Sequence, residues 1–177
     1  RYSDAFTFLT IANNTPHKNL RIIPEVIEEL KKESIYITFV ITIPNDEYMK
    51  IFKGYEKNVI NLGVIKPEEC PKAYAKCDAM FLPTLLEVFS ASYPEAMKMR
   101  KPILTSNLGF AKSICKDAAL YFDPIDPKDI ATKIKLLIED KKIQEDLILK
   151  GEKRVLEFPN SRQRAEKYIE ICKKIIK

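Results

Sequence analysis

Metal-binding patterns are missing from this sequence. The chain of 177 residues has a single histidine, His17, and its four cysteines, at positions 70, 77, 115 and 172, form no C-x-x-C pair. Structural zinc sites need closely spaced cysteine and histidine ligands, so the sequence predicts no metal site. We expect four reduced thiols, mostly in the core, and a cytoplasmic location.

Signals of several other protein classes are also missing. No apolar run approaches the 18 residues that a membrane-spanning helix needs, and residues 1–4 do not resemble a signal peptide. There is no G-x-G-x-x-G, Walker A or G-x-S-x-G motif, which argues against nicotinamide or flavin domains, P-loop enzymes and serine hydrolases. The net charge of +5 is spread through the chain, so we expect no nucleic-acid partner. Peripheral attraction to an anionic membrane surface stays open.

What the sequence does contain is a regular alternation of apolar runs and helical patterns. Runs rich in β-branched and aromatic residues predict six strands, at 6–11, 35–43, 59–62, 79–82, 103–105 and 119–122. Three- and four-residue apolar spacing and turn residues predict helices at 19–32, 47–53, 67–76, 91–99, 110–115, 127–139, 143–156 and 162–176. This alternation predicts a Rossmann-like, doubly wound α/β fold, a parallel sheet of about six strands with flanking helices, in one domain over 1–177.

Ligands of such sheets bind beyond the carboxyl ends of the strands, where the strand order switches. The polar and glycine residues of most interest follow predicted strands: the loop 12–18 after the first, Gly63 after the third and Glu87 after the fourth. The sequence therefore predicts a ligand site at this edge of the sheet.

The stretch 81–102 carries the most specific signal. Pro83 ends an apolar strand, Glu87 lies in the loop that follows, and Pro94 and Glu95 fall in the first turn of a predicted helix. A helix start offers free N–H groups and the positive end of a dipole to an anion. The two acids flank that anion site, and carboxylates accept hydrogen bonds from hydroxyl groups. A ligand with a negative middle and hydroxyl-rich ends, such as a nucleotide sugar, fits this arrangement.

These residues resemble the E-x7-E signature of retaining, nucleotide-sugar-dependent glycosyltransferases of family 4 (group 1), which have the two-domain GT-B fold. The matching positions are Pro83-Thr84, Glu87-Val88-Phe89-Ser90, Glu95-Ala96-Met97 and Pro102. The family has glycines where this chain has Val88 and Ser90. Glycine is the residue that best permits close approach of the backbone to a phosphate.

The resemblance implies a role for each acid and for one lysine. Glu87 would be the catalytic carboxylate, close to the donor sugar where positive charge develops. Glu95 would hold the ribose hydroxyls. Lys18, which opens the first helix, would bind the diphosphate, and a charge pair of this kind at about 4 Å is worth roughly 4 kcal/mol at an effective dielectric near 20.

The resemblance also implies weaker contacts to the donor. The backbone around Phe89, Ser90 and Ala91 would bind the diphosphate, and the main chain at Ile65 would lie beside the base. The family usually has an arginine five or six positions before the lysine, where this chain has Asn13 and Ala12, and a neutral hydrogen bond from Asn13 is worth only about 1 kcal/mol. We therefore expect weaker donor binding than in relatives that have the arginine.

The match covers only the carboxyl-terminal, donor-binding half of such an enzyme. The acceptor-binding domain would precede residue 1, so the fragment is expected to bind a nucleotide-diphospho-sugar but to transfer nothing alone. The resemblance implies no cofactor, no metal, and a glycan or lipid-linked acceptor. Two alternatives stay open: a non-catalytic nucleotide-sugar-binding or regulatory module, and a sugar-phosphate enzyme of unrelated α/β type such as an epimerase.

Overall fold

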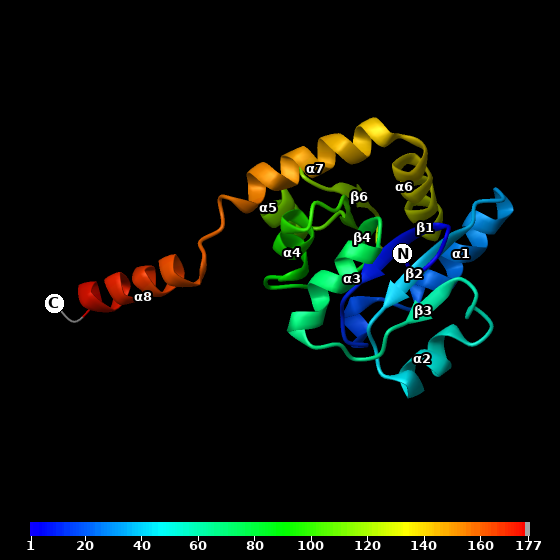
Figure 1. Ribbon diagram of the computed structural model, residues 1–177, viewed down its shortest axis with the longest axis horizontal. Helices are drawn as coiled ribbons and strands as arrows, with labels where there is room; N and C mark the ends of the chain where they lie inside the picture. Colours follow the sequence, from blue (N-terminus) through cyan, green and yellow to red (C-terminus); the bar gives the residue numbers. More distant parts are fainter. Residues whose placement is uncertain (176–177) are drawn as a thin grey trace.

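A six-stranded parallel sheet forms the centre of the protein (Figure 1). The computed structural model describes residues 1–175. The strands are β1 (Phe6–Thr10), β2 (Ile37–Ile41), β3 (Val59–Asn61), β4 (Ala79–Leu82), β5 (Ile103–Ser106) and β6 (Leu120–Phe122). Their order is β3-β2-β1-β4-β5-β6 and every pairing is parallel. The predicted Rossmann-like α/β fold is thus confirmed.

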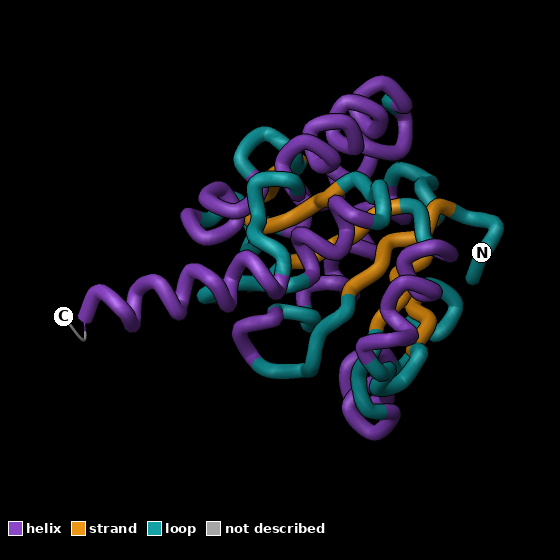
Figure 2. Tube along the Cα trace, turned by 60° about the vertical axis from the view of Figure 1, so that its left-hand side comes forward, coloured by secondary structure: helices purple, strands orange, loops and turns teal. Residues whose placement is uncertain are grey.

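Helices lie on both sides of the strands, as Figure 2 shows. The α-helices are α1 (Ile22–Lys32), α2 (Asn45–Phe52), α3 (Cys70–Lys76), α4 (Ser92–Lys98), α5 (Gly109–Cys115), α6 (Pro127–Glu139), α7 (Lys141–Val155) and α8 (Ser161–Ile175). Two short 3₁₀ turns, η1 (Pro16–Lys18) and η2 (Pro67–Glu69), complete the set. None of the described helices is long and apolar enough to span a bilayer.

Strand side chains alternate between two hydrophobic cores, because successive residues of a strand point to opposite faces. Phe8 packs with residues of α1 and α6, whereas its neighbour Leu9 packs with residues of α3, α4 and α5. β2, β4 and β5 are buried along their whole length. Continuous apolar runs are what a sheet covered on both faces requires.

Two predicted boundaries differ from the structure for local reasons. The helix predicted at 67–76 is divided into η2 and α3, because Pro71 has no N–H to donate to the carbonyl of Pro67. The helix predicted at 19–32 begins at Ile22, because Asn19 has a left-handed backbone with φ of 56° and ends η1. The remaining elements are present within a few residues of their predicted bounds.

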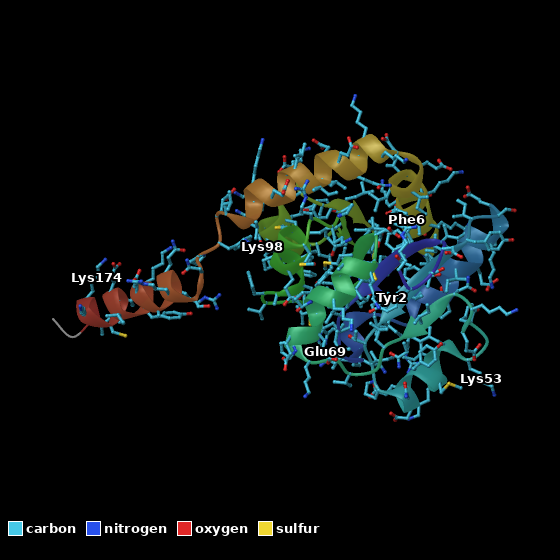
Figure 3. The ribbon with its side chains drawn as sticks, in the orientation of Figure 1. Tyr2, Phe6, Lys53, Glu69, Lys98 and Lys174 are labelled. Carbon is cyan, nitrogen blue, oxygen red and sulfur yellow. The ribbon has the colours of Figure 1, made fainter. Side chains whose placement is uncertain are left out.

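The last helix, α8, extends away from the body of the protein (Figure 1), and its side chains stand clear of the core as far as Lys174 (Figure 3). None of its residues is buried. Position 176 of the predicted helix lies outside the described residues. The thiols are less buried than predicted, since Cys77 and Cys115 are buried, Cys70 is half-buried and Cys172 is exposed.

A cluster of phenylalanines stabilises the core on the α1 and α6 side. Phe81 of β4 lies with its ring centroid 5.1 Å from that of Phe39 and 5.4 Å from that of Phe122, and all three are fully buried. We expect Phe81→Ala to lower the free energy of unfolding by about 3–5 kcal/mol, because it leaves a cavity among packed rings. Urea denaturation measures this change. Tyr36→Ala, at a 68% exposed residue, is the control, and equal losses in both variants would contradict the assignment of the core.

Candidate functional site

The sheet order places a topological switch point between the ends of β1 and β4. These strands are neighbours, but the chain leaves β1 toward β2 and leaves β4 toward β5. The two following loops therefore diverge at the carboxyl edge, which is where doubly wound sheets bind ligands. The loop after β1 ends in η1, which carries Lys18, and the loop after β4 carries Glu87.

Lys18 and Glu87 form an ion pair between the loops on either side of this switch point. The ammonium of Lys18 donates to Oε1 of Glu87, although the residues are 69 positions apart in the chain. The side chains are only 15% and 11% exposed, so solvent screens their attraction less than on an open surface. The structure thus brings the expected phosphate-binding cation and the expected catalytic acid into direct contact.

Glu95 lies in the first turn of α4, next to a buried phenol. The hydroxyl of Tyr74 lies 3.3 Å from Oε2 of Glu95 and 3.2 Å from the carbonyl of Ser92, so its one proton is shared between two acceptors. Burial, with the charge of Glu95 second, raises the pKa of Tyr74 well above its usual range. The phenol therefore stays protonated and remains a donor to the carboxylate at any ordinary pH.

Glu95, Phe89 and Ala91 line one cavity of about 580 Å³, which we call the Glu95 cavity. Residues of α3, of the end of α7, of the α7–α8 connection and of α8 also line it; they include Cys70, Tyr74, Val155, Phe158 and Arg164. The ring of Phe89 meets that of Phe158 edge-on, with centroids 6.1 Å apart. Three of the predicted donor-binding residues therefore line one cavity together with aromatic side chains.

Asn13 and Ile65 line a second cavity of about 540 Å³, the Asn13 cavity, at the ends of β1, β2 and β3. The side-chain oxygen of Asn13 accepts a 3.4 Å hydrogen bond from the hydroxyl of Thr15. Apart from Ser90, which lines neither cavity, the predicted residues are thus distributed between one ion pair and two cavities. Their roles toward a ligand stay predictions.

The loop 87–91 contains no glycine, and none of its residues has a positive φ. Val88 and Ser90, at the positions where the resembling family has glycines, are not among the described residues with positive φ. Val88 is 99% exposed, whereas Ser90 is buried and its carbonyl accepts a hydrogen bond from the N–H of Tyr93. In the described structure no side chain caps the start of α4.

Sequence reasoning missed two polar contacts that shape the site. It did not predict that Tyr74, which is buried and lines the Glu95 cavity, donates a hydrogen bond to Glu95. It gave no role to Asn19, whose side-chain amide donates a 2.8 Å hydrogen bond to the carbonyl of Pro124 and so ties the end of η1 to the segment after β6. The signal for Asn19 is its residue type, because asparagine is enriched at left-handed backbone positions.

A six-stranded parallel sheet with helices on both faces and a switch in strand order defines a Rossmann-like α/β protein. The family model described as "Glycosyl transferases group 1" matches residues 1–154. The chain therefore belongs to the group 1 glycosyltransferase family, with the fold of a GT-B carboxyl-terminal domain. No group of three or more histidine, cysteine or acidic residues gathers into a metal site within residues 1–175.

Individual relatives agree with this family. The chain is 25% identical over 134 residues to sulfoquinovosyl transferase SQD2 of Arabidopsis thaliana, which is 72% of this chain and 26% of that protein. Sucrose-phosphate synthase of Thermosynechococcus elongatus has a similar fold, with a TM-score of 0.84 and 16% identity over 98% of this chain and 46% of that one. The structure of Anabaena Alr3699/HepE in complex with UDP is similar with a TM-score of 0.80 and 16% identity, and the match covers 97% of this chain and 49% of that one. The chain thus spans about a quarter of the first relative and about half of the two structures.

Removing the internal partner of Lys18 tests the electrostatics of the site. We expect Glu87→Gln to bind inorganic pyrophosphate about fivefold to tenfold more tightly than the wild type, because the ammonium no longer has a carboxylate that competes with the anion. Isothermal titration calorimetry at low salt measures the affinity.

Glu33→Gln is the matched control for this change, because Glu33 pairs with Lys135 at exposed positions. It should bind pyrophosphate like the wild type. Unchanged or weaker binding by Glu87→Gln would contradict a role of Lys18 as the anion contact.

Proposed function

We propose that this chain is the donor-binding half of a retaining family 4 glycosyltransferase. It binds a nucleotide-diphospho-sugar, and the complete enzyme transfers a hexosyl group to a glycan or lipid-linked acceptor. The observation that carries this proposal is the meeting of Lys18 and Glu87 at the switch point of a group 1 glycosyltransferase fold. Similar structures in complex with UDP, such as Anabaena Alr3699/HepE, support a nucleotide donor.

The diphosphate lies in the crevice between the loops that follow β1 and β4. The ammonium of Lys18 neutralises its charge, and the backbone N–H groups around Phe89, Ser90 and Ala91 donate hydrogen bonds to its oxygens. When the anion takes over the ammonium, the carboxylate of Glu87 is released toward the donor sugar. There it stabilises the positive charge of an oxocarbenium-like transition state.

The nucleoside lies beside the diphosphate. Glu95 accepts hydrogen bonds from the ribose hydroxyls, and the phenol of Tyr74 holds one of its carboxylate oxygens in place. The main chain at Ile65 lies against the base, and Asn13 adds a neutral contact to the diphosphate. These roles use the residues of both cavities and the ion pair between them.

The acceptor lies on another domain. In the two structures reported above, this chain corresponds to about half of the molecule, which supports a second, acceptor-binding domain beyond residues 1–177. The site of a GT-B enzyme lies between its halves, so this half alone binds the donor and does not transfer it. We propose that transfer takes place in the cytoplasm or at the inner face of a membrane, without a metal or a resident cofactor.

Val88, Ser90 and Asn13 favour one alternative, a non-catalytic nucleotide-sugar-binding or regulatory module. They replace the two glycines and the arginine of the resembling pattern. Such a module would bind the same donor with the same acids. A transfer assay on the complete protein therefore separates the two functions, because only the enzyme transfers the sugar.

Titration of nucleotides tests donor binding. We expect one of UDP, GDP and ADP to bind the wild type, and Glu95→Ala to bind it about tenfold to hundredfold more weakly, because two ribose hydroxyls lose a charged acceptor. Calorimetry measures both affinities. Glu145→Ala, at an exposed acid of α7, should bind like the wild type. If none of the three nucleotides binds, or if Glu95→Ala binds as well as the wild type, the proposed site is wrong.

A single substitution tests the missing arginine. Asn13 is exposed at the rim of its cavity, so an arginine fits there without burial. We expect Asn13→Arg to bind the preferred nucleoside diphosphate about tenfold more tightly, because a charge-assisted hydrogen bond replaces a neutral one. Asn14→Arg, one position further along the same loop, is the control. No gain from Asn13→Arg over Asn14→Arg would place the diphosphate elsewhere.

A further inference from the structure

The hydroxyl of Thr84 is completely buried at the end of β4. It lies 3.0 Å from the carbonyl oxygen of His17 and 3.1 Å from that of Leu86, and it donates its one proton between them. His17 is the residue before Lys18 in η1. A side chain in the loop that carries Glu87 therefore holds the backbone of the turn that carries its partner.

The turn η1 has little else to hold it. None of its residues is buried, and in the described structure no side chain caps its start. Its internal bonds are those of a single 3₁₀ turn, Lys18 N–H to Thr15 and Asn19 N–H to Pro16, and a 3.3 Å contact between the hydroxyl of Thr15 and Nε2 of His17. Apart from the amide of Asn19 and the ion pair, its hydrogen bonds to the body run to one atom, the carbonyl oxygen of His17.

Two donors from the loop after β4 converge on that carbonyl. The N–H of Leu85 donates at 2.7 Å and the hydroxyl of Thr84 at 3.0 Å. Together they fix where the turn lies across the switch between β1 and β4. A lysine side chain has several rotatable bonds, so its ammonium can reach a range of positions. The position of the backbone determines where that range lies.

From this geometry we infer that Thr84 is a positioning residue for the anion site: its hydroxyl sets the register between the loop of Glu87 and the turn of Lys18. This inference rests on the proposed function, because it takes Lys18 as the contact for the diphosphate. Thr84 touches no ligand atom itself. It acts through the backbone of His17 and so on the placement of the neighbouring ammonium.

We expect the fold to tolerate removal of this hydroxyl. In Thr84→Val the carbonyl of His17 keeps the N–H of Leu85 as a donor, and Leu86, whose carbonyl loses its donor, is a residue that is 65% exposed. The chain also contains a matched control. The hydroxyl of Thr10, equally buried, donates a 2.6 Å hydrogen bond to the carbonyl of Phe81 and thus links the same two strands without touching η1.

The experiment measures the affinity of the full chain for inorganic pyrophosphate by calorimetry, with thermal unfolding of each variant. We expect Thr84→Val to bind pyrophosphate about fivefold more weakly than the wild type. A change of about fivefold in affinity corresponds to the net free energy of one ordinary hydrogen bond. Thr84→Ser, which keeps the hydroxyl, should bind within about twofold of the wild type. Thr10→Val should lose a comparable amount of stability and bind pyrophosphate normally.

Two failures are distinguishable. If the wild type binds no pyrophosphate, the proposed function fails and this inference fails with it. If the wild type binds but Thr84→Val binds equally well, or Thr10→Val weakens binding as much as Thr84→Val does, only the positioning role of Thr84 is overturned. Thr84→Ala, which also lacks the hydroxyl, gives the same comparison where Thr84→Val is too unstable to titrate.

Discussion

The ion pair between Lys18 and Glu87 joins two loops that the sheet topology sends in opposite directions. Neither side chain is open to solvent, and each has the other as its charged partner at the edge where a ligand would enter. An anion that binds here must replace a carboxylate, and the carboxylate must move to another partner. In the proposed function, occupation of the anion position is therefore coupled to release of an acid next to the donor sugar.

The surrounding structure serves to keep these two loops in place. β1 and β4 are neighbours in the middle of the sheet, with buried residues on both faces, so their ends move little relative to each other. The loops then add their own ties through the carbonyl of His17 and the amide of Asn19. Rigid strands with short polar ties at their ends are a common way to hold catalytic side chains in register.

Much of the fold could be predicted from local sequence pattern, because a strand that is buried on both faces needs apolar residues at nearly every position. The runs that became β2 and β4 are apolar throughout, and Pro83 marks the end of β4 where a ladder donor is no longer needed. The points at which helices are interrupted or begin late were harder to predict. Pro71 divides a helix that periodicity alone makes continuous, and the left-handed Asn19 delays the start of α1 by one turn.

The sequence supplied candidate residues for the site but not their pairing. Residue type, spacing and, for Lys18, the family resemblance pointed to Lys18, Glu87 and Glu95, but contact between Lys18 and Glu87 depends on side-chain conformations across 69 positions. The separation of Asn13 and Ile65 from Glu95 into different cavities depends on how three loops pack together. Thr84 matches the Pro-Ser/Thr position of the resembling pattern, but that match does not say which groups its hydroxyl contacts, so its bonds to the carbonyls of His17 and Leu86 could not be predicted.

One measurement tests the central claim most directly: a crystal structure of this chain with a bound nucleoside diphosphate. The account predicts that the ammonium of Lys18 lies within hydrogen-bonding distance of the diphosphate, that Glu87 has left it, and that Glu95 contacts the ribose. A diphosphate bound elsewhere, with the pair of Lys18 and Glu87 intact, would contradict it.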